Sequence, residues 1–379
     1  MTGICVEIGP PEAGHAAAWD DLCRRAAPNV FLSPSALGAV AACGFAKVHV
    51  LSAWDQDAAP RCLVGLWALE RRKIMPLWPA FLAGPAYDYA FVSTPVVDPA
   101  CTDAVIAAFF EAIARDPRLP KLIRLTHLDG HAESYAAIER ALRARRNQTL
   151  TLAKRERPFL DGEAGLKRSG STRKKLRQDW NRLSALGAAA IVNDRGATAA
   201  RAALEVFLTL EQKSWKGAHG TALLSDAKDA AFARRFIGDL ADAGQASVAL
   251  LTVDEAPIAA QVLLYCGSMA YTWKTAFDAA YAKYSPGALL LDKVTEDLFA
   301  HGATAIESCS PEGSFMEHLW SGRHATVEML IDVGSKTSLN FALAVMAERG
   351  YAQLKDLRAR LRAVNWPRLP KRGGLAASG

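Results

Sequence analysis

The sequence has 379 residues, of which 51% are hydrophobic and 22% are charged, and its formal net charge is +6. This composition is typical of a globular chain long enough for two domains, and it excludes a largely disordered protein. No apolar run approaches the roughly 20 residues of a membrane span, and the residues after Met1 lack the basic flank and apolar block of a signal peptide, so we expect a cytoplasmic protein.

The predicted elements follow one plan twice. In the first half the pattern predicts, in order, a helix at 35–43 ending at Gly44, strands at 48–52 and 63–69, a helix at 102–114 and a strand at 122–126. The same order recurs about two hundred residues later, with a helix at 232–243 ending at Gly244, strands at 248–253 and 259–265, a helix starting at Pro286 and a strand at 305–309. Each half is therefore predicted to be a mixed, mostly antiparallel sheet flanked by helices.

The domain boundaries follow from this repeat and from the cluster of Arg, Pro, Asp and Gly residues at 154–165. We expect a first domain at 1–156, a second at 157–337, a helix at 338–365 that packs on the second domain, and a flexible tail at 366–379. The seven scattered cysteines include no Cys-x-x-Cys pair, which favours reduced thiols, and no set of residues has the spacing of metal ligands, so we expect no metal site.

The segment from Ala270 to Trp320 carries the clearest functional pattern. Residues 270–277 alternate as a strand does, and the helix that follows begins with Ser285-Pro286-Gly287, where Ser285 is a suitable N-cap and Pro286 a suitable first residue. Backbone amides at such a helix start can hold an anionic cofactor. The candidate cofactor-binding residues are Tyr284, Ser285, Gly287 and Ala288, although an ordinary strand-to-helix connection shows the same local pattern.

The segment 167–182 holds seven basic residues against one acidic residue, Asp179. It is either a solvated helix face or an anchor for a phosphorylated or polyanionic ligand, and its candidate substrate-binding residues are Arg173, Lys174 and Arg177. Because the aromatic residues of a nucleic-acid surface are not interleaved with these charges, we expect no nucleic-acid partner, with one exception described below.

Several segments together resemble a known family. They are Phe31-Leu32-Ser33-Pro34, Arg173-Lys174-Lys175-Leu176-Arg177, Asp254-Glu255-Ala256-Pro257-Ile258-Ala259, and Phe277-Asp278 followed by Tyr281-Ala282 and Tyr284-Ser285-Pro286-Gly287. In their order and spacing the chain resembles the Gcn5-related N-acetyltransferase (GNAT) superfamily, in the tandem-domain branch associated with bacterial cellulose and exopolysaccharide biosynthesis. A sister family is the aminoacyl transferases that build peptidoglycan cross-bridges.

The resemblance implies an α/β fold with two tandem acyl-CoA N-acyltransferase domains, of which the first is a degenerate copy. It implies acyl transfer, with acetyl-CoA or another acyl-CoA as co-substrate, to an amine of a sugar or cell-envelope precursor, and the polysaccharide-synthesis machinery as a partner. The sequence departs from the usual phosphate loop at Ala282 and Ser285, and from the usual Tyr-Lys pair at Phe315 and Met316. Two alternatives stay open: a transferase that uses aminoacyl-tRNA on a cell-wall precursor, and a binding module without catalysis.

Attack of an amine on a thioester needs a base, a group that polarises the carbonyl, and an acid for the leaving thiolate. The candidate catalytic residues are Glu211 and Glu307 as bases, Lys274 as the cation, and Tyr281 as the acid. For each of these a salt bridge or half-buried packing is the structural alternative. The further candidates for substrate binding are Trp215, Asp278 and Trp320, where Asp278 could instead cap the turn that follows it.

Overall fold

The computed structural model describes residues 3–11, 16–74, 78–162, 166, 169–334 and 338–364. The helices and strands in this part of the chain are, in order, β1 (Ile4–Gly9), α1 (Ala16–Arg25), α2 (Pro34–Ala42), β2 (Val48–Asp55), β3 (Cys62–Arg72), β4 (Phe81–Gly84), β5 (Val96–Val97), α3 (Thr102–Arg115), β6 (Leu122–Asp129), α4 (Glu133–Arg145), β7 (Gln148–Asp161), α5 (Gly170–Ser184), β8 (Ala189–Val192), α6 (Ala197–Lys213), α7 (Trp215–Ala218), α8 (Ala227–Asp242), β9 (Ala246–Val253), β10 (Ala256–Cys266), β11 (Met269–Phe277), α9 (Pro286–Ala300), β12 (Ala305–Glu307), β13 (Arg323–Asp332) and α10 (Leu339–Val364).

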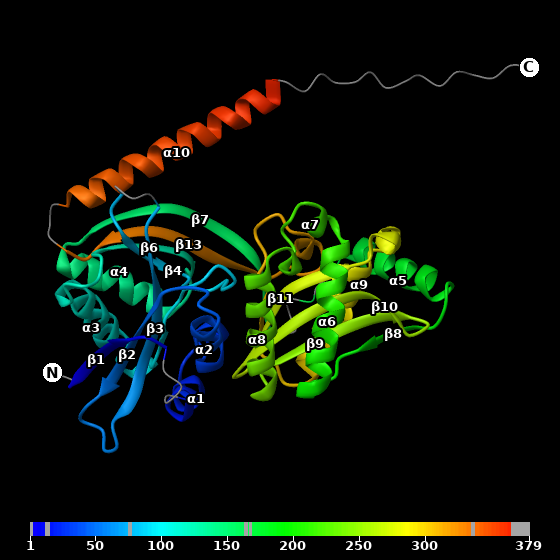
Figure 1. The fold of residues 1–379 in the computed structure, drawn as a ribbon, viewed down its shortest axis with the longest axis horizontal. Coiled ribbons are helices and arrows are strands. Elements are labelled where there is room, and N and C mark those ends of the chain that lie inside the picture. The colour runs from blue at the N-terminus through cyan, green and yellow to red at the C-terminus, as the bar shows by residue number, and fades with distance from the viewer. Residues whose placement is uncertain are drawn as a thin grey trace, which may run out of the picture.

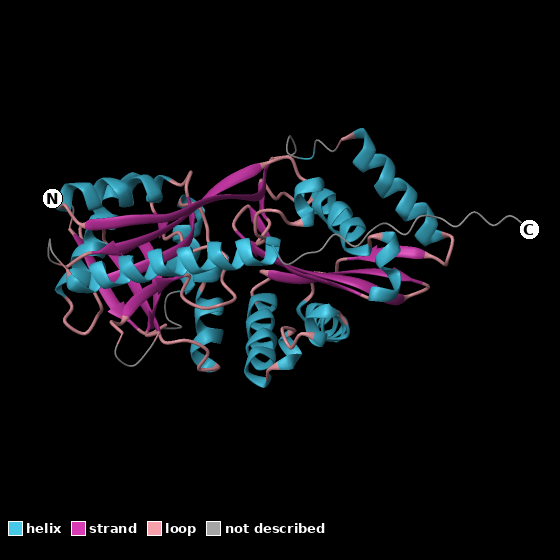
Figure 2. Ribbon diagram, turned by 90° about the horizontal axis from the view of Figure 1, so that it is seen from above, coloured by secondary structure: helices cyan, strands magenta, loops and turns pink. Residues whose placement is uncertain are grey.

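The predicted repeat is confirmed in the strand pairing. In the first half, β2 and β3 form an antiparallel hairpin, β4 joins β3 antiparallel, and β4 then pairs parallel with β6 across helix α3. The second half repeats this arrangement with β9, β10, β11 and β12, and with helix α9 as the crossover. The fold is therefore mixed α/β, with helices on both faces of the sheet in the second half (Figure 2).

The described strands of the two halves form one continuous sheet in the order β1-β2-β3-β4-β6-β13-β7-β12-β11-β10-β9-β8, with β5 paired to β3 beside this path. Strand β7 belongs to both halves, because it pairs with β13 over residues 148–158 and with β12 over residues 159–161. Strand β13, which comes late in the sequence, lies between β6 and β7 in the sheet of the first half. A division at residue 156 therefore stays a prediction, because this point lies inside β7.

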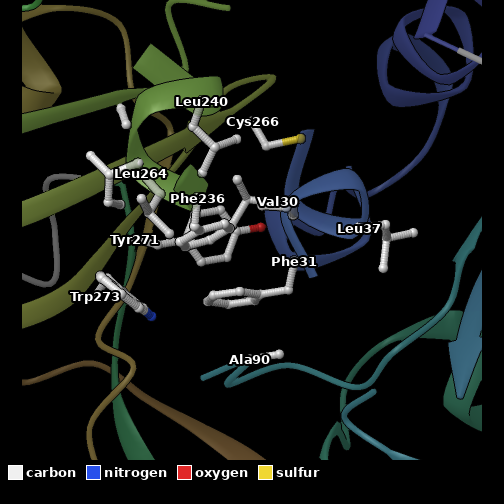
Figure 3. Close-up of a cluster of buried hydrophobic side chains, with 14 of the residues drawn as sticks. Val30, Phe31, Leu37, Ala90, Phe236, Leu240, Leu264, Cys266, Tyr271 and Trp273 are labelled. Carbon is white, nitrogen blue, oxygen red and sulfur yellow. The ribbon is translucent and has the colours of Figure 1, made fainter. Parts of the chain in front are cut away.

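The two halves share a hydrophobic core. Figure 3 shows Val30 and Phe31 of the first half packed toward Phe236, Tyr271 and Trp273 of the second. Helix α2 packs on helix α8 at this boundary, and the hydroxyl of Tyr271 donates to the backbone carbonyl of Pro28. Because these side chains are removed from water only when both halves are in place, each half stabilises the other.

Helix α10 spans the predicted residues, but the expectation that it packs on the second half is wrong. Its buried side chains, Phe341 and Ala344, pack with Phe81 and Leu122 of the first half and with Leu330 of β13, which lies in the sheet of the first half. Figure 1 shows α10, in orange to red, lying over β7 and β13. The cause is β13, which carries the end of the chain back to the sheet of the first half just before α10 begins. The expected tail at 366–379, and Lys167 and Arg168 of the basic segment, lie outside the described residues.

Candidate functional site

A gap opens in the sheet where β11 and β12 separate. The two strands pair in parallel only from Met269 to Tyr271 on β11, and β11 then continues alone on this side as far as Phe277. The register between β10 and β11 shifts at Val262, which leaves Trp273 as an extra residue in β11. Such a bulge bends its strand, and here it lies where the two strands diverge. The chain after β12 turns away through Cys309, which has a left-handed backbone conformation with φ 51°.

The gap is the middle of a cavity of about 850 Å³. This volume falls within the range of about 300–1,000 Å³ that is usual for small-molecule and cofactor sites. The walls come from α5, α7, β11, the start of α9 and the residues that follow β12, and they consist of Phe91, Ser171, Thr172, Lys175, Leu176, Trp215, Lys216, Thr272, Trp273, Lys274, Thr275, Phe277, Ser285, Pro286, Gly287, Ala288, Cys309, Ser310, Phe315, His318 and Leu319. Three of these described lining residues are lysines and none is Asp or Glu, so the cavity suits a negatively charged ligand.

The outer end of the cavity lies at the start of α9, but this helix start differs from the expected one. Ser285 has a left-handed conformation with φ 52°, and its side chain caps no backbone amide, so the prediction of Ser285 as a side-chain N-cap is wrong. Its hydroxyl instead accepts a hydrogen bond from Lys175 Nζ, at 2.9 Å. The left-handed turn directs the chain into α9 without the usual capping geometry.

Most backbone amides at this helix start are also occupied. The Ser285 N–H donates to the Ala282 carbonyl, the Ala288 N–H donates to the Ser285 carbonyl, and Pro286 has no N–H. Among the described residues, no hydrogen bond from the Gly287 N–H is found. The expectation of several unpaired amides at 284–288 is therefore reduced to one, and Lys175 supplies the positive charge beside it.

The inner end of the cavity contains a buried cluster of charges. Glu211 on α6 is fully buried, and its Oε1 atom lies 3.0 Å from Lys216 Nζ and 3.5 Å from Lys274 Nζ. Its Oε2 atom accepts the backbone N–H of Leu223 at 2.9 Å. One carboxylate thus holds two ammonium groups in place, and both lysines line the cavity whereas Glu211 itself does not.

Lys274 is the more buried lysine, with 13% of its side chain exposed. Burial lowers the pKa of Lys274, and the Glu211 carboxylate acts in the opposite direction. The ammonium also lies over the ring of Tyr89, at 4.9 Å from the centroid, which favours its charged form. Burial likewise raises the pKa of the Cys309 thiol well above its usual range, so this thiol is protonated and a poor nucleophile.

Glu307 does not line the cavity. It is 1% exposed, and its Oε1 atom accepts a hydrogen bond from Arg157 Nη1 at 3.1 Å and another from the Cys309 backbone N–H at 3.0 Å. Arg157 also contacts His127 Nδ1, and the pKa of His127 is lowered to about 4, first by burial and then by the Arg157 charge. Glu307 thus belongs to a buried network that joins β6, β7 and β12.

Other predicted site residues lie outside the cavity. Asp278 accepts the backbone N–H of Ala280 and so caps the turn after β11, and Trp320 is buried with its Nε1 donating to Thr295 Oγ1. Tyr281 and Tyr284 pack together with ring centroids 6.5 Å apart, and neither lines the cavity. Of the candidates, the cavity brings together Lys274, Trp215, Ser285, Gly287 and Ala288.

The basic helix α5 contributes one residue that was not singled out. Lys175 faces the cavity, whereas Arg173 and Arg177 line a separate hollow of about 270 Å³ between α5 and α9, and Lys174 is exposed. Lys216 was missed because it follows the Ser214 break after α6, where the helical period gives no information about direction. Phe91 was missed because it comes from the first half, and only the packing of the two halves places it here.

The corresponding gap in the first half is filled by its own chain. Beyond the short pairing of β4 with β6, the Ser93 N–H donates to the His127 carbonyl, the Ser93 hydroxyl contacts the Thr126 carbonyl, and Thr94 Oγ1 accepts the Asp129 N–H. The segment between β4 and α3 thus forms hydrogen bonds with the backbone of β6. In the second half, the corresponding position beside the diverging strands is the cavity. The first half contributes Phe91 to the wall of that cavity.

Comparison with known proteins shows what most of the segment around this cavity is similar to. Residues 170–312 match the family model described as an acetyltransferase (GNAT) domain. Among solved structures, FemX superposes with a TM-score of 0.58 and 12% identity, covering 90% of this chain and 100% of FemX. A conserved protein of unknown function from Bacteroides thetaiotaomicron gives 0.57 at 11% identity, with coverages of 86% and 100%. L-PGS from Bacillus licheniformis gives 0.51 at 14% identity, with coverages of 90% and 97%.

At these identities the superpositions establish the fold alone, and they do so over nearly the whole chain. A search of curated protein sequences found no match. No described helix is both long and apolar enough to cross a membrane. Within the described residues, no three His, Cys, Asp or Glu side chains are grouped as metal ligands would be.

Proposed function

From the premise that residues 170–312 form a GNAT domain, we propose that the protein transfers an acyl group, acetyl in the simplest case, from acyl-CoA to an amine of a sugar or cell-envelope precursor. The observation that carries this proposal is the cavity between the diverging strands β11 and β12, which runs from the start of α9 to Lys274. A ligand with a negatively charged part at one end and a reactive carbonyl at the other fits such a passage.

The outer end would hold the diphosphate of the acyl-CoA. Lys175 Nζ, the Ser285 hydroxyl and the Gly287 N–H provide one cation and two hydrogen-bonding groups at a helix start, where the dipole also favours negative charge. Since only one backbone amide is available, a larger share of the binding falls to Lys175 than in a phosphate loop built from amides alone.

The inner end would hold the thioester. The acceptor amine attacks the thioester carbonyl, a C–N bond forms, the C–S bond breaks, and the departing thiolate takes up the proton that the nitrogen loses. We assign the Lys274 ammonium to stabilise the negative charge on the carbonyl oxygen, and Glu211 to position Lys274 and Lys216. Cys309 is a protonated, buried thiol, which favours direct transfer over an acyl-cysteine intermediate.

The acceptor would enter past two exposed aromatic rings. Trp215 is 64% exposed and Phe315 45% exposed, and both line the cavity. Flat apolar surfaces beside polar groups suit the faces of sugar rings, which supports a sugar-containing acceptor. Because the acceptor amine must be neutral to react, transfer requires it to lose its proton before attack.

The test is titration calorimetry with acetyl-CoA on three proteins. At Gly287 an added Cβ would lie 3.5 Å from Phe277 Cδ1 and from Thr275 Cγ2, which is ordinary contact. Gly287→Ala should therefore bind acetyl-CoA like the wild type, whereas Gly287→Glu places a carboxylate against the diphosphate and should weaken binding at least about 10-fold. Equal binding by all three proteins would show that acetyl-CoA does not bind at this helix start.

A second candidate function is favoured by the exposed side chains of Arg173, Lys174 and Arg177 on α5. They suit a polyanion, as in aminoacyl transfer from a charged tRNA to a cell-wall precursor. RNA binding that falls steeply with salt, in a protein that does not bind acetyl-CoA, would select this function. Binding of acetyl-CoA without release of free thiol to any amino-sugar acceptor would instead indicate a binding module without catalysis.

A further inference from the structure

Helix α10 is attached to the protein near its beginning and along one side. Phe341 and Ala344 are buried against the first half, and Glu348 pairs with Arg124 on β6. Beyond these contacts the helix rises away from β7, as Figure 1 shows. The side chains that the structure describes between Arg349 and Arg358 are exposed.

The side of α10 that faces away from the sheet is apolar. Its large exposed side chains are between 45% and 83% exposed, and they are Leu339, Leu343, Met346, Tyr351, Leu354 and Leu357. At 3.6 residues per turn all of these positions except Tyr351 fall within an arc of roughly 80° whose centre is opposite Phe341, and Tyr351 lies about 60° outside this arc, on the side of Ala344. An apolar stripe of this length is unusual on a water-exposed helix and indicates an interaction surface.

The same end of the sequence carries the whole net charge of the chain. Residues 339–379 contain eight Lys or Arg and two Asp or Glu, whereas residues 1–338 contain equal numbers of basic and acidic residues. By the helical period, Arg349 and Arg358 flank the apolar stripe on its two sides. An apolar stripe between basic flanks is the pattern of a helix that lies in a membrane interface.

We propose that α10 binds the surface of an anionic lipid bilayer, with Leu343, Met346, Leu354 and Leu357 in the interfacial layer and its arginines at the headgroups. A lipid surface engages both features of the helix: the acyl region receives the apolar stripe, and the anionic headgroups attract the basic flanks. The surface is separate from the cavity, and the inference does not depend on the proposed acyl transfer.

Two other occupants fit less well. A second copy of α10 would bring Arg349 and Arg358 close to the same arginines of its partner, and Glu348, one of the two acidic residues of the helix, already pairs with Arg124. A nucleic acid would engage the arginines but leave the leucines in water. An anionic membrane surface can interact with both features, because its headgroups attract the basic residues and its acyl region accommodates the exposed leucines.

The test is co-sedimentation of the full chain with vesicles of phosphatidylcholine, with and without phosphatidylglycerol. Binding should be at least about 10-fold stronger to the anionic vesicles and should weaken as salt rises. The double variant Leu354→Glu/Leu357→Glu should lose at least about 10-fold in binding. Both residues are exposed, so circular dichroism should show an unchanged fold.

The matched control is Leu186→Glu/Val192→Glu, which adds the same charge at two positions of the second half that are each 51% exposed. This control should bind anionic vesicles nearly like the wild type, because it leaves α10 intact. The proposal is overturned if the α10 variant and the control bind alike, or if neither kind of vesicle binds the wild type. It is also overturned if the α10 variant instead abolishes a dimer seen by light scattering, or if the wild type binds RNA and not vesicles.

Discussion

The surroundings of Lys274 constrain what a single residue can do in the cavity. Its ammonium faces Glu211, Lys216 and the ring of Tyr89, and Tyr89 in turn donates its hydroxyl hydrogen to Asp229. Burial lowers the pKa of Lys274 below its ordinary value, so as pH rises this group loses its charge before a surface lysine does. Loss of a proton from the acceptor amine has the opposite effect and raises activity, because only the neutral amine attacks.

Activity should therefore rise with pH as the acceptor loses its proton and fall again as Lys274 loses its own, with the second apparent pKa below that of an ordinary lysine. Lys274→Met should lower kcat about 100-fold and remove the alkaline fall. Lys283→Met, which replaces an exposed lysine outside the cavity, should keep the wild-type profile. A wild-type rate that continues to rise through this range would identify Lys274 as a base and contradict its assignment as a cation.

Helices α2 and α8 are the elements that hold the two halves together beside the site. Phe232 on α8 is fully buried and stacks on Phe45, with ring centroids 4.4 Å apart, and on Phe236 at 5.3 Å. It also stacks on Tyr89, with ring centroids 5.8 Å apart, and the Lys274 ammonium lies over the ring of Tyr89. Phe232 is thus connected to Lys274, at the inner end of the cavity, through one intermediate side chain, Tyr89.

Phe232→Ala should lower the free energy of unfolding by about 3–5 kcal/mol, because it removes a buried ring and leaves a cavity between the halves. Urea denaturation followed by tryptophan fluorescence measures this change. Phe315→Ala removes a ring that is 45% exposed, and it should change the stability by only about 0.5 kcal/mol. If the two variants lost equal stability, the aromatic boundary would not be the joint between the halves.

At the scale of the whole molecule, the position of β13 makes the halves inseparable. The side chains of Val327, Met329 and Ile331 complete the core under α3 and α4 of the first half, although they come from the end of the chain. Strand β13 also supplies hydrogen-bonding partners to both β6 and β7. Without it, the first half would expose the edges of two strands and part of its core.

We therefore expect a fragment of residues 1–156 to remain unfolded or to aggregate when expressed alone, and the full chain to unfold in one cooperative transition. Circular dichroism and calorimetry can check both outcomes. Addition of residues 157–334 as a separate chain should restore folded structure in the mixture, because this fragment brings β13. A fragment 1–156 with a cooperative transition of its own would show that β13 is dispensable.

The sequence by itself determined those elements that recur in the two halves, and their order, because these depend on side-chain periods and terminal residues within a few positions of one another. The alternation through β11 and the Pro286 start of α9 are examples, and both were predicted at nearly their observed bounds. The mixed sheet flanked by helices could be predicted for the same reason, since the repeated order of elements restricts the ways in which they can pack, whereas the expectation of a GNAT-like fold came from the resemblance to that family.

The tertiary structure alone decided which of the predicted side chains meet. Lys175 contacts Ser285 across 110 residues and Arg157 contacts Glu307 across 150, and no local pattern distinguishes these partners from the other charged residues. The place of β13 in the first half, and hence that of α10, depended on competition among strand edges far apart in the chain. Such pairings are selected by the free energy of the assembled sheet and core, to which every strand contributes, and a short stretch of sequence does not contain that information.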